Sequence, residues 1–538
     1  MNTNRSWRFT VPGSLIRWCG NRRWELGVFL AGLIAVRGFA PHHEPLWMIF
    51  GLGILIHAVS RASSWRRGAG LGFWFGFGHH LLGFSWLLTS LNQHGGLWMG
   101  WSILILALLA ATMALYVALF GAILGRLGPA PSLLPVVAPA LWVIAEWLRS
   151  RLFSGFPWNL AGYGWDGQEV LLQVGDLGGI ELLSWLMVFP AAVLALSANW
   201  RVYLRPLIFW GGTLLCTFAM AVGYGVWRSD NVTNEWPSFP SAKRENGLLR
   251  VALVQGNIDQ QRKWDPSYRE ESFNRYLEMS GSITGPVDLV VWPETAISFF
   301  LQADPRSQER VMSLSQRLSA PILTGAPMAD KDGKGRWLYY NSMILIDSSG
   351  DPMLRYDKYH LVPFGEFIPL RNFFPPFIRK LTHGTEDFSR GPGPVALPWH
   401  RGGIGCLVCY EVIFPHEVRQ LAMATPSVRW LINVTNDAWF GEAAKPQHLA
   451  MARFRAIENR LPMIRVANTG ISAVFDPLGR ELGRIPANVS GILKMEVPQG
   501  TGSTFFQKSE PWWIFLWIFL VFCPWVCGKI QNGQDCGD

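Results

Sequence analysis

A series of long apolar stretches constrains this chain more than any other feature of its sequence. A helix needs roughly 20 mostly apolar residues to cross the hydrocarbon of a bilayer. Several stretches reach or approach that length, although the first, second, fifth and last are short. They are Glu25–Ala40, Leu46–Ser60, Gly70–Ser90, Leu97–Leu124, Ser132–Trp147, Leu171–Ser197, Leu204–Val226 and Trp512–Cys527. We therefore expect an α-helical polytopic membrane domain with about eight spans.

The amino-acid composition points the same way. Half of the residues are hydrophobic and only 16% are charged, whereas soluble proteins carry about 25% charged residues. The 28 tryptophans also suit a membrane protein, because amphipathic rings favour the membrane–water interface. The net charge of +9 does not indicate nucleic-acid binding, because the basic residues lie between apolar stretches and form no Lys/Arg-rich run.

The basic residues also predict the orientation of the chain, because cytoplasmic loops carry an excess of lysine and arginine. With the N-terminus inside, the outer loops hold only Arg149 and Arg151 near a membrane end. The inner segments hold Arg5, Arg8, Arg17, Arg22, Arg23, Arg61, Arg66, Arg67, Arg126, Arg201, Arg205 and Lys529. We expect both termini to be cytoplasmic and the long segment before the last span to face the periplasm of a bacterium. An N-terminal anchor is favoured over a signal peptide, because no small-residue cleavage site follows the first apolar stretch.

The residue pattern changes after residue 228, where short runs of β-favouring residues begin to alternate with polar helical stretches. This alternation is typical of an α/β domain with a mixed sheet. The expected strands are Leu249–Gln255, Asp288–Trp292, Pro321–Thr324, Ser342–Asp347, Gly403–Cys409, Trp430–Thr435, Ile464–Asn468, Ser472–Phe475 and Ile492–Val497. The expected helices are Pro266–Ser282, Arg306–Ser319, Pro415–Ala424 and Pro446–Asn459.

Three parts of the chain follow from these patterns. Residues 1–228 form an N-terminal membrane domain with about seven spans, and residues 229–510 form the outward-facing α/β domain. Residues 511–538 form the last span and a cytoplasmic tail. The polar, proline-containing stretch Asn231–Arg244 is predicted to link the first two parts.

Glu294 is the first candidate for chemistry, because it directly follows an apolar strand and Pro293. A carboxylate at the carboxyl end of a strand is well placed for a site in an α/β sheet. Acidic residues also favour the first turn of helices, so a structural role is the competing interpretation.

The second candidate segment mixes Lys358, His360 and Glu366 with apolar residues. A lysine here can stabilise an oxyanion, although a lone lysine is more often a solvated surface residue. We interpret His360 as structural, because no histidine or carboxylate lies at metal-ligand spacing from it.

The third candidate is Cys409, which ends a strand two residues before Glu411. A cysteine at a strand-to-turn junction is a candidate nucleophile if a base lies near it. A buried inert cysteine is one alternative, and a redox or zinc motif formed with Cys406 is another. The seven cysteines are odd in number and irregularly spaced, which does not indicate a disulfide framework.

Together these segments resemble the nitrilase, or carbon–nitrogen hydrolase, superfamily, which uses a Glu–Lys–Cys triad in this chain order. Longer motifs resemble the apolipoprotein N-acyltransferase family. These motifs are Trp292–Thr295, Leu361–Glu366, Cys409–Glu411, Thr435–Gly441, Gln447-His448, Arg453, Arg455-Ala456, Glu458, Asn468–Gly470 and, in the membrane part, Gly155–Trp158.

The resemblance implies an extracytoplasmic nitrilase-like domain, an α-β-β-α sandwich, on a polytopic domain in the bacterial inner membrane. It implies transfer of a fatty acyl chain from a phospholipid, typically phosphatidylethanolamine, to the α-amine of a diacylglyceryl-cysteine apolipoprotein. This transfer is the last step of lipoprotein maturation. No cofactor, metal or nucleic acid is implied.

The resemblance also implies roles for individual residues. Cys409 would form a thioester in a ping-pong reaction, Glu294 would move the protons, and Lys358 would stabilise the oxyanion with the backbone N–H of Tyr410. Glu366 and Glu411 would orient the site. Trp264 is either an aromatic of a substrate loop or an anchor at the membrane interface.

Two other functions remain open from the residues alone. A membrane-anchored amidase or nitrilase would use the same triad with water as the acyl acceptor. A transporter or scaffold with an inactive enzyme domain would be favoured by ionisable residues inside the spans. His79, His80 and Glu146 are such residues, and we interpret them as packing or interfacial groups.

Overall fold

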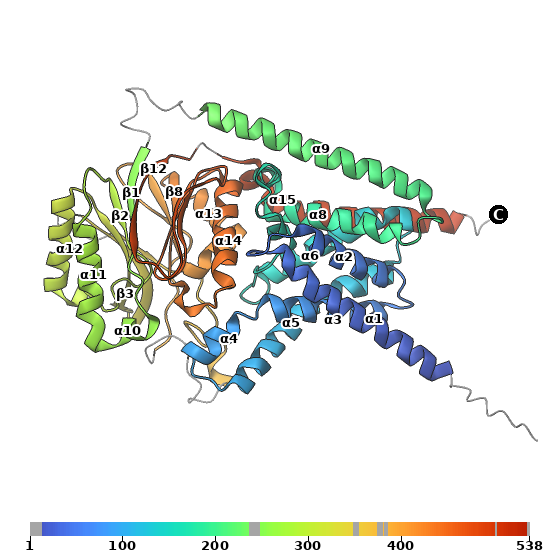
Figure 1. The fold of residues 1–538 in the computed structure, drawn as a ribbon, viewed down its shortest axis with the longest axis horizontal. Helices are drawn as coiled ribbons and strands as arrows, with labels where there is room; N and C mark the ends of the chain where they lie inside the picture. The colour runs from blue at the N-terminus through green and yellow to red at the C-terminus, as the bar shows by residue number, and fades with distance from the viewer. Residues whose placement is uncertain are drawn as a thin grey trace, which may run out of the picture.

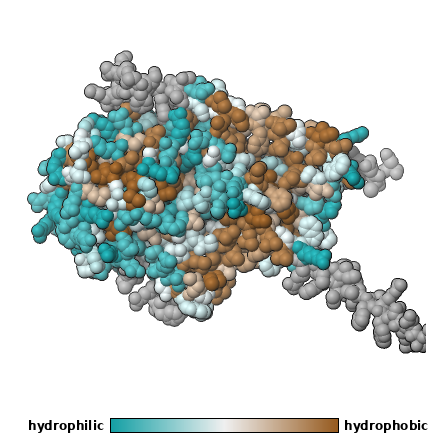
Figure 2. Space-filling view, viewed as in Figure 1, coloured by the Kyte–Doolittle hydropathy of each residue, from teal (hydrophilic) through white to brown (hydrophobic). Residues whose placement is uncertain are grey.

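The computed structural model of the protein describes residues 13–235, 248–347, 354–373, 380, 386–500 and 503–534. A helical bundle and an α/β domain lie next to each other (Figure 1). Apolar surface gathers over the bundle, whereas the surface of the α/β domain is mainly polar (Figure 2). The two parts therefore differ in surface chemistry as the sequence predicted.

Long helices account for every one of the expected apolar stretches. They are α1 (Gly13–Ala35), α2 (Pro45–Ser60), α3 (Trp65–Gly83), α5 (Met99–Leu127), α6 (Leu134–Arg151), α8 (Gly175–Ser197), α9 (Leu204–Glu235) and α15 (Phe505–Gln534). Short helices connect them: η1 (Val36–Gly38), α4 (Leu87–Thr89), η2 (Ser90–His94), η3 (Pro131–Leu133), η4 (Ala161–Trp165) and α7 (Glu169–Leu172). Several apolar helices in the N-terminal half are thus confirmed.

By length and composition, 4 helices in the described part of the chain can cross a membrane. They are Met99–Leu127, Pro131–Arg151, Gly175–Ser197 and Leu204–Asn231, and Pro45–Ser60 is a shorter apolar helix. The number of about eight spans therefore stays a prediction.

Two helix ends differ from the expected boundaries. Helix α9 continues to Glu235, so the first residues of the expected linker are helical, and residues 236–244 of that linker lie outside the described residues. Helix α15 begins at Phe505, where the Phe506 ring packs against Gly179 at a kink in α8. Gly179 has a φ of 61°, and the ring occupies the space that a Cβ would need.

The α/β domain contains two mixed sheets of six strands each, as expected for an α-β-β-α sandwich. The first sheet has the order β12-β1-β2-β3-β4-β5 and the second β11-β10-β9-β8-β7-β6. Parallel pairs stand at the centre of both sheets, and antiparallel pairs flank them. The strands of the first sheet are β1 (Leu248–Gln255), β2 (Leu289–Val291), β3 (Ile322–Lys331), β4 (Trp337–Ile346), β5 (Leu354–Asp357) and β12 (Gly491–Pro498). Those of the second are β6 (Ala396–Leu397), β7 (Gly403–Val408), β8 (Val428–Thr435), β9 (Met463–Ala467), β10 (Ser472–Phe475) and β11 (Glu481–Ile485).

Helices cover the outer faces of both sheets, which makes the domain a four-layered α-β-β-α sandwich (Figure 1). Helices α11 (Arg269–Gly281) and α12 (Pro305–Leu318) pack on the first sheet through one apolar core. A second core lies between the two sheets. Helices α13 (Pro415–Ala422) and α14 (Ala444–Asn459) pack on the second sheet and share a core with the membrane helices. The second sheet is thus the one tied to the bundle.

Candidate active site

The three residues of the expected triad all lie at the carboxyl ends of strands, although β5, which precedes Lys358, was not among the expected strands. Glu294 follows β2 in the first sheet, Lys358 follows β5 at the edge of that sheet, and Cys409 follows β7 in the second sheet. All three side chains are buried. The site therefore lies where strands of both sheets end.

Asn341, on strand β4, connects two carboxylates in the site. Its Nδ2 donates hydrogen bonds to Oε1 of Glu294 at 2.8 Å and to Oε1 of Glu366 at 2.9 Å. The other oxygen of Glu366 lies 2.8 Å from Nζ of Lys358. A continuous buried chain therefore runs from Glu294 to Lys358. Sequence reasoning missed Asn341, because nothing in its neighbourhood in the sequence distinguishes it from other strand residues.

The charged groups of this hydrogen-bonded chain set the protonation states of Lys358 and Cys409 in the resting protein. Burial opposes the charge of Lys358, but Glu366 and Glu294 together raise its pKa above the ordinary value. Burial and the negative charge of Glu294 raise the pKa of the Cys409 thiol well above its usual range, although Lys358 opposes this effect. We therefore expect a charged lysine beside a protonated thiol at neutral pH.

Glu411 ties the loop of Lys358 to the turn of Cys409. Its Oε1 accepts hydrogen bonds from the Tyr356 hydroxyl at 2.9 Å and from the backbone N–H groups of Tyr359 and His360 at 2.8 and 3.1 Å. Its Oε2 accepts one from the N–H of Val408 at 2.7 Å. Burial raises the pKa of Glu411 to about 7. The Glu411 carboxylate thus holds the segment around Lys358 next to the turn that carries Cys409.

The backbone of Cys409 is held in an uncommon conformation, with a φ of 51°. Its carbonyl oxygen accepts hydrogen bonds from Nδ2 of Asn433 at 3.3 Å and from Nε2 of His448 at 3.2 Å. Burial and the nearby Arg465 lower the pKa of His448, although Asp437 opposes this shift. Strained turns of this kind cluster at functional sites, and the nucleophile candidate Cys409 occupies one of them.

A second buried lysine, Lys263, lies beside the site and was not anticipated from the sequence. Its Nζ donates a hydrogen bond to the backbone oxygen of Glu294 at 2.8 Å. Burial lowers the pKa of Lys263 to about 7, although Glu294 and Cys409 oppose the shift. Lys263 belongs to helix α10 (Gln260–Trp264), which ends at the half-buried Trp264. Helix α10 is therefore tethered to the base candidate, and its last residue is the tryptophan that was expected to be either a substrate-loop aromatic or an interfacial anchor.

A loop of the helical bundle contacts the turn that carries Cys409. The Phe156 ring stacks on the ring of Tyr410 with 6.4 Å between centroids. Nε1 of Trp158 donates to Oε1 of Gln447 at 2.8 Å, and the Trp158 ring lies 5.7 Å from that of His448. Residues of the bundle and of the α/β domain that lie far apart in the sequence thus pack directly against each other next to the turn that carries Cys409.

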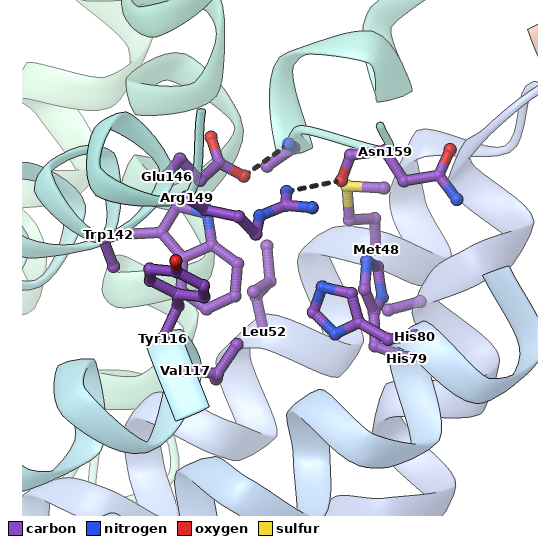
Figure 3. Close-up of a pocket in the computed structure, with 13 residues that line it drawn as sticks. Met48, Leu52, His79, His80, Tyr116, Val117, Trp142, Glu146, Arg149 and Asn159 are labelled. Atoms are coloured by element: carbon purple, nitrogen blue, oxygen red, sulfur yellow. Dashed lines mark hydrogen bonds between the residues drawn. The ribbon is translucent and has the colours of Figure 1, made fainter. Parts of the chain in front are cut away.

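Arg149, on α6, holds this loop from within the bundle (Figure 3). Its guanidinium donates to the backbone oxygens of Phe156, Trp158 and Asn159 at 3.3, 2.7 and 3.3 Å. Glu146, one turn earlier, accepts from the N–H of Ala161 at 2.7 Å. These two charged residues of the bundle therefore fix the loop that supports Tyr410.

His79 and His80, which were expected to be packing or interfacial groups, line a small cavity with Arg149 and Glu146 (Figure 3). The cavity measures about 20 Å³, which is enough for about one water molecule. Both imidazoles and the Glu146 carboxylate are buried. They are therefore interior packing groups of the bundle and do not lie at its surface.

Two family models match the chain. The model described as carbon-nitrogen hydrolase matches residues 250–505. The model described as apolipoprotein N-acyltransferase N-terminal domain matches residues 31–193. The two matches coincide with the α/β domain and with most of the helical bundle.

Relatives match the chain over nearly its whole length. An apolipoprotein N-acyltransferase of Geobacter metallireducens is 36% identical over 504 residues, which cover 92% of this chain and 93% of the relative. Those of Brucella melitensis (34% identical, 94% of each chain) and Vibrio vulnificus (32% identical, 91% of this chain and 94% of the relative) are similar too. The crystal structure of a CN-hydrolase superfamily protein from Xanthomonas campestris is 21% identical, with a TM-score of 0.35, over 50% of this chain and 96% of that protein.

Proposed function

Because the chain belongs to the apolipoprotein N-acyltransferase family, we propose that Glu294, Lys358 and Cys409 carry out its acyl transfer. The enzyme is an acyltransferase that uses lipoprotein and phospholipid substrates. The proposed donor is phosphatidylethanolamine, and the proposed acceptor is the α-amine of a diacylglyceryl-cysteine. The observation that carries the proposal is the buried chain from Glu294 through Asn341 and Glu366 to Lys358.

In the first proposed step, Cys409 attacks the ester carbonyl carbon of the phospholipid. Its thiol is protonated at rest, so Glu294 takes the proton as the C–S bond forms. Glu294 then gives that proton to the glycerol oxygen as the C–O bond breaks. Lysophospholipid leaves, and the acyl group remains on Sγ as a thioester.

In the second proposed step, the uncharged amine of the acceptor attacks the thioester carbon. Glu294 takes a proton from the attacking nitrogen, and the proton passes to Sγ as the C–S bond breaks. The product carries an amide, and Cys409 is a thiol again. The two steps together give ping-pong kinetics.

The negative charge that develops on the carbonyl oxygen in both steps needs a fixed positive partner. Lys358 is proposed to supply it, together with the backbone N–H of Tyr410. Glu366 orients the Lys358 ammonium through their 2.8 Å contact, and Glu411 holds the turn that carries Tyr410. Preorganised donors of this kind cost no reorganisation during the reaction.

We also propose that about eight spans hold the protein in the inner membrane, with the α/β domain in the periplasm and both termini in the cytoplasm. The positive-inside bias supports this orientation, and the apolar surface of the bundle supports its insertion (Figure 2). The proposed parts are residues 1–228, 229–510 and 511–538. A site close to the bilayer avoids extracting acyl chains, which costs about 0.8 kcal/mol per CH₂.

Intact mass spectrometry of the purified protein tests the proposal. The protein is exposed to phosphatidylethanolamine vesicles and then to a diacylglyceryl-cysteine peptide. We expect an acyl adduct on Cys409 that moves to the peptide amine. An adduct lost only to water would indicate a membrane-bound hydrolase, which is the competing function.

Two cysteine variants complete the experiment. Cys409→Ala should form no adduct, whereas Cys406→Ala, three residues away in the buried core between the sheets, should behave like the wild type. Absence of any adduct on the wild-type protein with this donor would overturn the thioester mechanism.

A further inference from the structure

A hydroxyl group contacts the nucleophile candidate from strand β8. Oγ1 of Thr435, the last residue of that strand, lies 3.2 Å from Sγ of Cys409. The same oxygen lies 2.8 Å from Oδ1 of Asp437. All three side chains are buried. One hydroxyl proton is therefore shared between two possible acceptors, the sulfur and the carboxylate.

The carboxylate of Asp437 is held in its charged form. Nη2 of Arg465 donates to Oδ2 of Asp437 at 2.6 Å. Burial opposes the negative charge, but Arg465, together with His448 and the hydrogen bond from Thr435, holds the pKa of Asp437 well below its usual range. A charged carboxylate only accepts hydrogen bonds, so the Thr435 hydroxyl donates a hydrogen bond to Asp437 while the sulfur carries its own hydrogen.

We propose that Thr435 is a further catalytic residue, whose hydroxyl turns from Asp437 to the sulfur of Cys409 when the thiol loses its proton. This inference rests on the proposed role of Cys409 as the nucleophile. In the thiol form, Oγ1 presents a lone pair to Sγ. In the thiolate form, rotation about the Cβ–Oγ1 bond points the O–H at the sulfur.

This rotation leaves the chemical balance of the reaction unchanged. The thiol proton still passes to Glu294 and then to the glycerol oxygen, and Thr435 keeps its own proton throughout. Arg465 continues to pair with Asp437 after the hydroxyl has turned. The sulfur therefore gains a hydrogen bond when it becomes charged, and hydrogen bonds to charged groups are the stronger ones.

Other charged groups act on the same sulfur and remain in place when Thr435 is changed. Glu294 and Asp437 raise the pKa of Cys409, and Lys358 lowers it. Lys263 also lies within electrostatic range of Cys409. A change confined to the hydroxyl of Thr435 thus isolates its hydrogen bond from these charges.

The test compares Thr435→Val, which removes the hydroxyl but keeps the shape, with Thr435→Ser, which keeps the hydroxyl. The first readout is the single-turnover rate of acyl-adduct formation on Cys409 from phosphatidylethanolamine vesicles. We expect Thr435→Val to slow it roughly 10- to 100-fold, the range for a lost hydrogen bond to a charged group. Thr435→Ser should stay close to the wild-type rate.

The second readout is the pH profile of Cys409 alkylation by iodoacetamide, followed on the Cys409 peptide by mass spectrometry. Thr435→Val should shift this profile to higher pH, because the thiolate loses its donor. Thr435→Ala, which relieves any strain from the second methyl group, should give the same shift. A purely structural role would lower the folded fraction of these variants without moving the profile of the folded protein.

The outcomes separate this inference from the function on which it rests. If wild-type protein forms the adduct and Thr435→Val forms it equally fast with an unshifted profile, the role of Thr435 is overturned. If the wild type forms no adduct, the thioester mechanism fails first. A slow Thr435→Val with a wild-type-like Thr435→Ser supports the hydroxyl as a catalytic group.

Discussion

The ammonium of Lys358 lies 2.8 Å from the carboxylate of Glu366, and both side chains are almost completely buried. A buried charge that loses its partner is strongly destabilising, because neither water nor another charge compensates it. The Glu366 side chain also accepts a hydrogen bond from Asn341, which contacts Glu294. Loss of this ion pair is therefore expected to affect both the stability of the domain and the geometry of the site.

We predict that Glu366→Gln lowers the free energy of unfolding of the α/β domain by about 3–5 kcal/mol, as breaking a buried ion pair does. Acyl transfer should fall with it, because Lys358 loses its orienting carboxylate. Denaturant unfolding and acyl transfer of the purified protein measure both effects. Glu496→Gln, at an exposed position of β12, is the control and should change neither. Wild-type stability of Glu366→Gln would show that the pair contributes little.

We predict that alkylation of Cys409 accelerates steadily with pH. Because the pKa of the thiol lies well above its usual range, the reactive thiolate is a small fraction at pH 7 that grows tenfold per pH unit. The rate of iodoacetamide modification should therefore rise from pH 7 to 9 without levelling off. In Lys358→Met the rate at each pH should fall, because the lysine charge favours the thiolate. A plateau below pH 8 in the wild type would mean that the thiolate already exists at neutral pH.

We predict that Asp437→Asn lowers the free energy of unfolding at neutral pH and that this loss of stability is smaller in acid. The change leaves Arg465 buried without its carboxylate, which costs about 3–5 kcal/mol. The pKa of Asp437 is lowered in the folded protein, so its stabilisation is present above the unfolded pKa, about 3.9, and is lost as pH falls toward the folded pKa. The deficit of the variant should shrink below about pH 4.

Unfolding measured between pH 3 and 8 tests this sign. Asp230→Asn, exposed on helix α9, is the matched control and should behave like the wild type at every pH. A deficit that grows as pH falls would contradict the prediction.

Arg149→Met should disturb the site from within the bundle. Three backbone oxygens lose their donor, and a buried acceptor left without a partner costs about 1–3 kcal/mol. We expect a lower thermal stability and slower acyl-adduct formation, because the loop that carries Phe156 supports Tyr410. Arg126→Met, exposed near the end of α5, is the control. Full activity of Arg149→Met would show that the loop does not need this anchor.

Cys406→Ala and Cys409→Ser should separate the two neighbouring thiols. Cys406 is buried in the core between the sheets, so its loss to alanine should cost only about 1 kcal/mol and leave acyl transfer intact. Cys409→Ser should abolish transfer, because a hydroxyl is far less acidic than a thiol. Transfer assays on both folded variants measure this. Inactivity of a folded Cys406→Ala protein would favour a function for the pair as a Cys-x-x-Cys motif.

Most elements of the α/β domain were predictable, and the strands that were missed share one property. Strands β5, β6 and β11 all lie at sheet edges. An edge strand pairs on one side only and is often short or charged, so it lacks the apolar run that marks a central strand. The two-residue β6 and the polar Glu481–Ile485 fit this description. The division into two sheets was expected only from the resemblance to the nitrilase superfamily, because pairing between distant segments leaves no local signal.

The amino-acid sequence by itself determined where chemistry could occur. The apolar stretches indicated a membrane domain, and polar groups at strand ends marked Glu294, Lys358 and Cys409 as candidates. These features are local, because hydrophobic runs and strand ends are properties of neighbouring residues.

Only the tertiary structure decided which other side chains contact those three candidates. Asn341 reaches Glu294 across 47 positions of the chain, and Lys263 reaches it across 31. Thr435 meets Cys409 across 26 positions. Such contacts depend on how sheets and helices pack, and the packing also removes the water that would otherwise keep each pKa near its ordinary value. Long-range packing, therefore, turns three candidate residues into one buried and electrostatically coupled site.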